Sequence, residues 1–194
     1  MAFLGVAARP GRRTVRGATL AAFLTLLPLA RLWSQNAHPT ADQVKAVFLF
    51  NFAQFVEWPD AAFAGPGSPL VIEIFGEDPF GSYLDETVSG ETVRGRPLVV
   101  RRTRRIEDIR NCHMLFLSPS EESRFDAILA ALKDRPILIV SDAPGFARRG
   151  GMVGFAFEQS RVRVKINPDA ARTAGLTISS KLLHAADIVT PGGH

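Results

Sequence analysis

Apolar residues recur with the period of a helix in the stretch that follows Thr40. Thr40 and Gln43 form the capping-box pattern that begins many helices. The apolar positions after them fall on one broad stripe: Val44, Val47, Phe48, Phe52, Phe55 and Val56. This spacing predicts an amphipathic helix that ends near Trp58, because Pro59 cannot continue it.

The stretch 50–59, FNFAQFVEWP, places Asn51 among aromatic residues. At about 100° per residue, Asn51 falls near the centre of the apolar stripe, whereas Phe50 points almost the opposite way. A buried amide must find hydrogen-bond partners, so we expect Asn51 to have a structural role and to hold a neighbouring loop through its backbone. Phe50 and Trp58 then need other cover, which is either a second layer of the same chain or another molecule.

Short, nearly continuous apolar runs follow at residues 70–75, 96–100, 114–117 and 137–140. Helix-sized segments separate them, including a short helix after Phe80 and a longer one over 120–133 that Ser120 caps. Strands that are covered on both faces have this pattern. The sequence therefore predicts an α/β fold, with a mostly parallel open sheet flanked by helices in a Rossmann-like sandwich.

The pattern changes after residue 150 to a strict alternation of apolar and basic positions. Three apolar residues at 162, 164 and 166 alternate with Arg161, Arg163 and Lys165. One solvated face indicates an antiparallel hairpin at or near an edge of the sheet. The basic row either protects an edge strand from other chains or meets an acidic partner or anionic ligand. Two helices should follow, one that Gly175 stops and one over 177–189.

Residues 1–34 differ in composition from the rest of the chain. They hold five arginines and no acidic residue, and an apolar run of about 13 residues fills positions 18–30. A bilayer-spanning helix needs about 20 residues, so this layout is that of a secretory signal peptide, cleaved near Ser34. The alternative is an uncleaved membrane anchor. We expect residues 38–190 to form a single domain without stable membrane insertion.

Removal of the leader changes the charge balance. The whole chain has a formal net charge of +4 and a pI near 9.8, but without five of its 23 Lys and Arg it has 18 against 19 acidic residues. A mature charge of about −1 gives no reason to expect a nucleic-acid partner. Cys112 is the only cysteine, so no internal disulfide can form, and its place at the start of a buried strand predicts an inert thiol with a structural role.

No arrangement of residue types in the sequence indicates catalysis, a metal or a cofactor. The four histidines lie without metal-ligand spacing, and Ser141 lacks the glycines of a nucleophile elbow. The glycine-rich stretch 144–155 has no phosphate-loop spacing and leads into a strand, which predicts a tight connection with Arg148 and Arg149 at its tip, where they could hold an anion. Glu73 interrupts an apolar strand and needs either an open strand end or a nearby cation.

Seven blocks of sequence, in order, resemble the YfiR-like family from about residue 40 to 189. They are VKAVFLFNFAQFVEWP, IFGEDPFG, RGRPLVVRR, CHMLFLSPSE, ILIVSDAPGFARRGGMVGF, RVRVKIN and AARTAGLTISSKLL. The resemblance implies a compact α/β protein of the periplasm that is not an enzyme and tends to form homodimers. It implies repression of an inner-membrane diguanylate cyclase, through binding to its periplasmic domain, and hence control of cyclic di-GMP. Some members are redox-sensitive; Cys112 matches a family cysteine, but Glu73 stands where its disulfide partner would be expected, so no disulfide switch is expected.

Two sets of binding residues follow from these considerations. For the membrane partner we expect contacts from Phe50, Trp58, Phe146, Arg148 and Arg149. For an anion we expect Arg161, Arg163 and Lys165. An alternative function is a periplasmic sensor or carrier of a small anion or nucleotide, bound beyond the strand ends near 76–80, 118–120 and 141–145. A further alternative is a hydrolase that uses Ser141 and His113.

Overall fold

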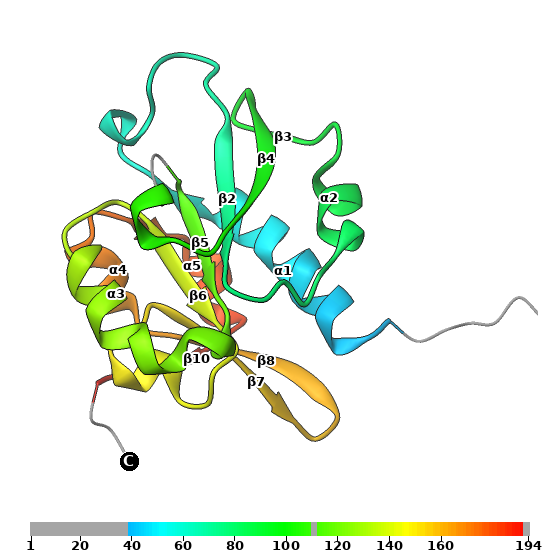
Figure 1. Ribbon diagram of the computed structural model, residues 1–194, viewed down its shortest axis with the longest axis vertical. Coiled ribbons are helices and arrows are strands. Elements are labelled where there is room, and N and C mark those ends of the chain that lie inside the picture. Colours follow the sequence, from blue (N-terminus) through cyan, green and yellow to red (C-terminus); the bar gives the residue numbers. More distant parts are fainter. Residues whose placement is uncertain (1–38, 110–111, 192–194) are drawn as a thin grey trace, which may run out of the picture. The chain divides into compact units, whose positions relative to one another are not determined.

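The computed structural model describes residues 39–109 and 112–191 (Figure 1). The predicted signal peptide at 1–34, its cleavage near Ser34 and the alternative of an anchor lie outside the described residues. Within the described part of the chain, no helix has both the length and the apolar character needed to cross a membrane.

Eight strands of the described residues form one sheet in the order β10-β8-β7-β6-β5-β2-β4-β3 (Figure 1). Their bounds are β2 (Leu70–Phe75), β3 (Thr92–Val93), β4 (Arg96–Thr103), β5 (Met114–Leu117), β6 (Leu138–Ser141), β7 (Val153–Glu158), β8 (Arg161–Ile166) and β10 (Asp187–Ile188). Strands β4, β2, β5, β6 and β7 are parallel, whereas β8 runs antiparallel to β7 and β3 antiparallel to β4. The predicted fold class is thus confirmed, with the hairpin near one edge.

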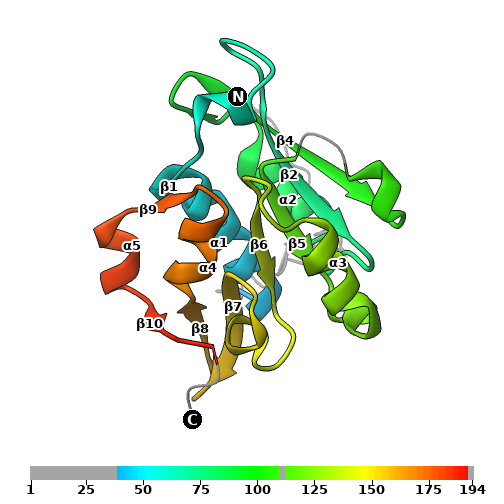
Figure 2. The ribbon, with the colours of Figure 1, turned by 90° about the vertical axis from the view of Figure 1, so that its left-hand side faces the viewer.

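Helices cover both faces of this sheet. They are α1 (Ala41–Phe55), α2 (Ser82–Val88), α3 (Phe125–Ala131), α4 (Pro168–Thr173) and α5 (Ser180–His184), with 3-10 turns η2 (Asp60–Ala62), η3 (Ile106–Asp108), η4 (Pro119–Arg124) and η5 (Phe146–Arg149). Figure 2 shows β5 and β6 between α1 and α3. Every residue of β2, β5 and β6 is buried, which is why these strands have continuous apolar sequences.

Helix α1 begins as the sequence predicts. The Thr40 hydroxyl accepts a hydrogen bond from the Gln43 N–H at 3.2 Å, and the Gln43 side chain accepts one from the Thr40 N–H at 2.9 Å. The helix ends at Phe55, three residues before the predicted end, because the next two residues form β1 (Val56–Glu57). This strand pairs antiparallel with β9 (Thr177–Ile178).

The buried face of α1 differs from the predicted stripe. It consists of Lys45, Ala46, Leu49, Phe52 and Ala53. Asn51 lies about 200° around the helix from Leu49, is half-buried, and makes no side-chain hydrogen bond among the described residues. The expectation that Asn51 is buried and holds a loop is therefore wrong. Residues 46–50 are all apolar, so their periodicity does not distinguish one face from another.

Two predicted helices are broken in the structure. The segment 120–133 divides into η4, which ends at Arg124, and α3, which begins at Phe125, and Glu121 within η4 has non-helical backbone angles. Its cap is Ser118, whose hydroxyl accepts from the Ser120 N–H, so the prediction of Ser120 as cap is wrong. The segment 177–189 is helical only in α5, because its two ends pair as β9 with β1 and as β10 with β8. Strand pairing with distant segments outweighs local helix propensity here.

Candidate functional site

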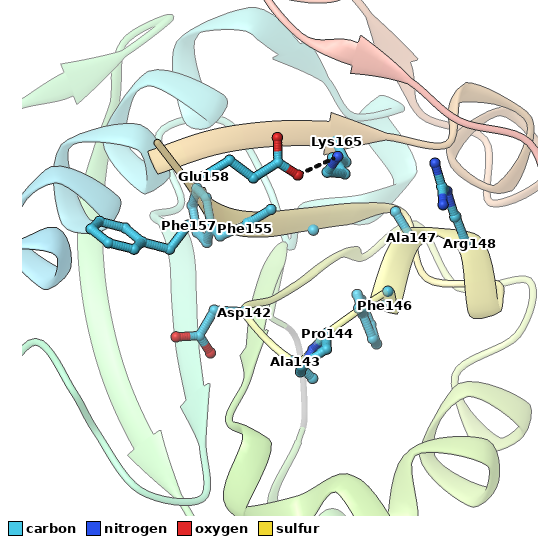
Figure 3. A pocket seen from close by; sticks show the side chains of 13 residues that line it. Asp142, Ala143, Pro144, Phe146, Ala147, Arg148, Phe155, Phe157, Glu158 and Lys165 are labelled. Carbon is cyan, nitrogen blue, oxygen red and sulfur yellow. Dashed lines mark ion pairs between the residues drawn. The ribbon is translucent and has the colours of Figure 1, made fainter. Parts of the chain in front are cut away.

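A cavity of about 480 Å³ lies between the loop after β6 and the β7–β8 hairpin (Figure 3). Its walls are residues 142–148, residues 154–158 and Lys165; we call it the hairpin cavity. The chain leaves β6 sharply because the Ser141 hydroxyl accepts a hydrogen bond from the Ala143 N–H at 3.1 Å. Gly145 and Gly150, with φ of 69° and 99°, then bound η5, and their left-handed backbone suits glycine.

The η5 turn packs directly on the start of β7. A side chain at Gly151 would lie 2.2 Å from the Phe146 ring, and one at Gly154 would lie 3.4 Å from the Ala147 backbone nitrogen. Phe146 is only 1% exposed, and its ring contacts that of Phe125 at 5.4 Å between centroids. The sequence-based interpretation of a tight connection is therefore right, but the expectation that Phe146 offers its ring to a partner is wrong, because its ring is part of the core.

Arg148 and Arg149 are both exposed but occupy different surroundings. Arg149 pairs with Glu122 at 2.8 Å and lies over the ring of Phe125. Arg148 borders the hairpin cavity and has no ion pair among the described residues (Figure 3). Of these two arginines, only Arg148 is thus placed to meet an anionic group inside the cavity.

The predicted basic row on β8 is divided by its acidic neighbours. Lys165 borders the hairpin cavity and pairs with Glu158 at 2.8 Å (Figure 3). Arg163 pairs with Asp187 of β10 at 2.9 Å. Arg161, next to the tip of the hairpin, is exposed. Because β10 pairs only with Lys165 and Ile166, the rest of β8 has no outer neighbour among the described strands, so its arginines are placed to deter pairing with other chains.

A buried lysine joins α1 to the loop that borders the cavity. Lys45 is 9% exposed, and its Nζ lies 2.6 Å from both Asp142 Oδ2 and Asp42 Oδ1. Burial disfavours the charge of Lys45, but the hydrogen bonds to Asp142 and Asp42 outweigh it and raise its pKa. The other carboxylate oxygen, Asp142 Oδ1, is buried and accepts no hydrogen bond among the described residues. Asp142 thus has one oxygen in the ion pair and one to which no described residue donates.

Aromatic stacking links α1 to the base of the hairpin. Phe155 of β7 contacts Phe48 and Phe52 of α1, with ring centroids 6.0 and 5.8 Å apart. Phe157, two residues further along β7, is 69% exposed. The hairpin is therefore fixed at its base, and it presents an aromatic ring to solvent near its end.

Trp58 is a core residue, so its cover comes from the same chain and the expectation that it contacts the partner is wrong. It is 8% exposed, and its Nε1 donates to the His113 carbonyl at 2.8 Å. Phe63 stacks on the His113 ring at 4.4 Å, and the Arg96 guanidinium lies 3.7 Å from the centre of the Phe63 ring. His113 is a core histidine in this stack. Its Nδ1 accepts from the Val71 N–H at 3.1 Å, and burial lowers its pKa, so the ring is neutral at neutral pH.

The geometry contradicts a hydrolase that uses Ser141 and His113. The two residues belong to neighbouring parallel strands, in which Met114 lies opposite Leu138. His113 precedes β5, whereas Ser141 ends β6, so they are about 13 Å apart along the strand direction. They cannot form a nucleophile–base pair, which needs about 3 Å. Among the described residues, no group of three or more His, Cys, Asp or Glu could hold a metal ion.

The remaining predicted residues lie at two other places. Phe50 is half-buried and packs against the core. Asn51 borders a shallow groove of about 290 Å³ on the outer side of α1, next to Val47, Phe48 and Tyr83. Neither contacts the hairpin cavity, so the structure does not bring Phe50 together with Arg148.

Cys112 is buried beside an acidic residue. It is 5% exposed, and burial, followed by the charge of Glu73, raises its pKa to about 12. A thiol with this pKa stays protonated at neutral pH and is a poor nucleophile. Glu73 itself is 3% exposed and lies opposite Arg101 in the β2–β4 register, so the strand end is not open and a cation is adjacent.

Sequence reasoning missed two features of the site: the Lys45–Asp142 pair and the exposed ring of Phe157. Lys45 lies within an apolar helix, and its partner is 97 residues away. A lysine inside an apolar stretch was a signal for a buried ion pair, but it did not identify the partner. Phe157 belongs to the predicted hairpin, and only the position of the hairpin relative to α1 reveals that its ring is exposed.

Comparisons with curated sequences and with solved structures do not assign a function to the chain. A search of curated protein sequences finds no match. Among solved structures, the chain is similar to the ABC domain in complex with L-Trp from Streptococcus pneumonia, with 12% identity and a TM-score of 0.45. That match covers 62% of this chain and 55% of the other, so the chain spans about half of that protein's length, and so distant a likeness carries no functional argument.

The model of the YfiR/HmsC-like family matches residues 42–187, from the first turn of α1 to the start of β10. Members of this family are periplasmic regulators of diguanylate cyclases, and their role is regulatory, not catalytic. Since the match extends over most of the chain, the protein belongs to the YfiR/HmsC-like family.

Proposed function

We propose that the protein is exported to the periplasm, binds the periplasmic domain of an inner-membrane diguanylate cyclase, and represses cyclic di-GMP synthesis. The observation that carries this proposal is the family match over residues 42–187. The N-terminal composition supports it, since residues 1–34 have the layout of a secretory signal peptide.

The exposed residues around the hairpin and η5 form the surface that we assign to the partner. Phe157 supplies an exposed ring and Arg148 supplies positive charge, whereas Arg149 pairs with Glu122 outside the hairpin cavity and is not assigned to this surface. An exposed aromatic side chain that becomes buried on docking is a common energetic anchor, while charged neighbours set orientation and association rate. Trp58 and Phe146 are not part of this surface because they are buried. Phe50 is half-buried, packs against the core and does not border the hairpin cavity.

The proposal is tested with the purified mature protein and the periplasmic domain of the candidate cyclase. Calorimetry should give saturable binding, and Phe157→Ala should lower the affinity at least tenfold without a change in melting temperature. The matched control is Val99→Ala. Val99 is also an exposed apolar residue, 37% accessible, but it belongs to β4, and three other strands separate β4 from β7 in the sheet. Absence of any binding by the folded wild-type protein would refute the proposal.

A second candidate function is the sensing of a small anion or nucleotide, and the hairpin cavity favours it. Arg148 and Lys165 border this cavity together with the apolar residues of the loop. Of the three strand ends expected to hold such a ligand, only the one near 141–145 borders it. A side chain at Gly76 would lie 2.7 Å from Ser120 Oγ, so the space between the ends of β2 and β5 is filled.

A thermal-shift screen with nucleotides and small carboxylates distinguishes the two functions. Sensing requires a ligand that raises the melting temperature of the wild-type protein but not that of Arg148→Gln. If no ligand does so, the cavity does not bind this class of molecule.

A further inference from the structure

We propose that the open edge of β7, with the hairpin cavity beside it, binds an extended segment of the partner's periplasmic domain as an added β-strand. This inference rests on the proposed function for the identity of the partner and goes beyond it by assigning the mode of binding. Strand addition uses backbone hydrogen bonds for affinity and side-chain contacts for specificity.

Strand β7 extends well past the end of its neighbour. It pairs with β6 at only two positions, Val140↔Val153 and Ser141↔Gly154. It then continues to Glu158 alongside β8, and on its other side the described chain provides no further strand. The hairpin therefore projects from the sheet, as Figure 1 shows. Four residues of β7, about 13 Å of strand, have an open edge.

The hairpin register identifies the backbone groups at this edge. A two-residue loop, Gln159 and Ser160 with φ of 50° and 61°, joins the strands in the manner of a type I′ turn. Glu158 and Arg161 close this loop, and the two residues of such a closing pair hydrogen-bond to each other through their backbones. Along an antiparallel ladder, hydrogen-bonded pairs alternate with pairs that are not hydrogen-bonded to each other. Phe157 and Val162 form one of the latter pairs. Phe157 therefore directs its N–H and C=O away from β8, toward the open edge.

Space is available on both faces of that edge. Phe155, Ala156 and Phe157 border the hairpin cavity, and they also border a second cavity of about 120 Å³ next to Ala41 and Lys45 of α1. A strand that added to β7 would alternate its side chains between these two cavities. A compact ligand held on one face would need only one of them.

The polar groups at the two ends of the hairpin cavity specify the chemistry of the segment. Asp142 lies toward the Phe157 end, and Arg148 lies at the η5 end (Figure 3). Asp142 Oδ1 is buried and accepts no hydrogen bond from the described residues, and Arg148 has no ion pair among them. The segment should therefore carry an N–H or O–H donor near Asp142 and a carboxylate near Arg148. At the Asp142 end, an apolar side chain would pack on the exposed ring of Phe157.

Two pairs of variants separate strand addition from simple surface contact. Phe157→Pro removes the outward N–H without removing a β7–β8 hydrogen bond, and Phe157→Val removes the ring but keeps that N–H. Val162→Pro is the backbone control, because it removes an N–H that faces the opposite edge of the same hairpin. It is compared with Val162→Ala, because the Val162 side chain borders the second cavity. Arg148→Gln tests the charge at the end of the cavity, with Arg149→Gln as its control, since Arg149 faces Glu122 outside the cavity.

The probe is the purified periplasmic domain of the candidate cyclase, titrated by calorimetry into each variant of the mature protein. Melting temperatures confirm that each variant is folded. We expect Phe157→Pro to bind at least tenfold more weakly than Phe157→Val, and Arg148→Gln at least fivefold more weakly than wild type. Val162→Pro should remain within twofold of Val162→Ala, and Arg149→Gln within twofold of wild type. In the complex, the Phe157 amide should gain protection from hydrogen exchange.

Different outcomes refute different claims. If the wild-type protein binds the domain and Phe157→Pro binds as well as Phe157→Val, strand addition is wrong while the proposed function stands. If Phe157→Pro is unfolded, strand addition is refuted when wild type and Arg148→Gln bind equally well and the Phe157 amide gains no protection in the complex. If the variants alter only self-association, the edge of β7 pairs with a second copy of this chain, and strand addition by the partner is refuted. Failure of the wild type to bind refutes the proposed function, and strand addition with it.

Discussion

Replacement of Lys45 by Met should destabilise the protein strongly, because it leaves a buried carboxylate without its cation. The Lys45 and Asp142 side chains are 11% and 20% exposed, and their charged atoms are 2.6 Å apart. Removal of one partner from a buried ion pair costs about 3–5 kcal/mol. The partial exposure of Asp142 places the expected loss near the lower end, at about 3 kcal/mol. For a domain of this size, that corresponds to a fall in melting temperature of about 6–12 °C.

A double-mutant cycle assigns the loss to the ion pair. Asp142→Asn alone should cost less than Lys45→Met, because Lys45 keeps Asp42, at 2.6 Å, as its partner. The double variant should be more stable than the sum of the two single losses indicates, by at least 1 kcal/mol. Urea denaturation monitored by tryptophan fluorescence gives the four unfolding free energies, those of the wild type, the two single variants and the double variant. A loss below 1 kcal/mol in Lys45→Met would mean that the pair is effectively solvated and does not fix α1 to the loop after β6.

Three further expectations concern buried residues. Because burial lowers the pKa of His113 in the folded state, the unfolded chain binds a proton at this histidine at a higher pH than the folded chain does. The contribution of His113 to the free energy of unfolding should therefore be fully present above about pH 6.5 and decrease below it. In thermal melts, His113→Asn should show a smaller fall in melting temperature between pH 7.5 and 5.5 than the wild type. Cys112 should resist a thiol reagent at pH 8 in the native state and react fully in urea; rapid native labelling would contradict its burial. Trp58→Phe removes the indole donor, but the His113 carbonyl keeps the hydrogen bond from the Leu138 N–H, so the variant should lose about 0.5–1.5 kcal/mol in urea denaturation and keep its partner affinity. A stable variant that fails to bind would mean that Trp58 contacts the partner.

Strand positions could be predicted from the sequence because burial on both faces leaves a direct mark on composition. The apolar runs at 70–75, 114–117 and 137–140 coincide with β2, β5 and β6, whose residues are all buried. The run at 96–100 also belongs to a strand, β4, but only Leu98 of that strand is buried, so the expectation that this strand is covered on both faces is wrong. The alternation of basic and apolar residues after 160 likewise identified the hairpin. Each of these signals depends on residues within one short segment, so no knowledge of distant contacts was needed.

The orientation of α1 could not be predicted in the same way. Apolar residues surround this helix, since it packs on the sheet, on α2 and on α5. Periodicity therefore gave the wrong centre for its buried face and placed Asn51 inside. Similarly, Trp58 and Phe146 have the composition of surface anchors, but their burial depends on His113 and Gly151, which other segments supply. Only the tertiary arrangement decides whether an aromatic residue is core or surface.

The candidate site was predictable in part. The sequence identified the loop around Arg148 and the basic residue Lys165, and both border the hairpin cavity. It did not indicate that Asp142 and Phe157 border the same cavity, because this depends on how far β7 extends past β6. A difference in length between neighbouring strands has no local signature in either strand.

The most direct test of the account is the rate of cyclic di-GMP synthesis by the membrane-embedded cyclase as the purified mature protein is added on its periplasmic side. Cyclase in nanodiscs, supplied with GTP, gives this rate. We expect a saturable fall in the rate, and a weaker fall with Arg148→Gln than with Arg149→Gln at equal concentration. An unchanged rate at saturating, folded wild-type protein would contradict the claim that this protein represses the enzyme by binding to it.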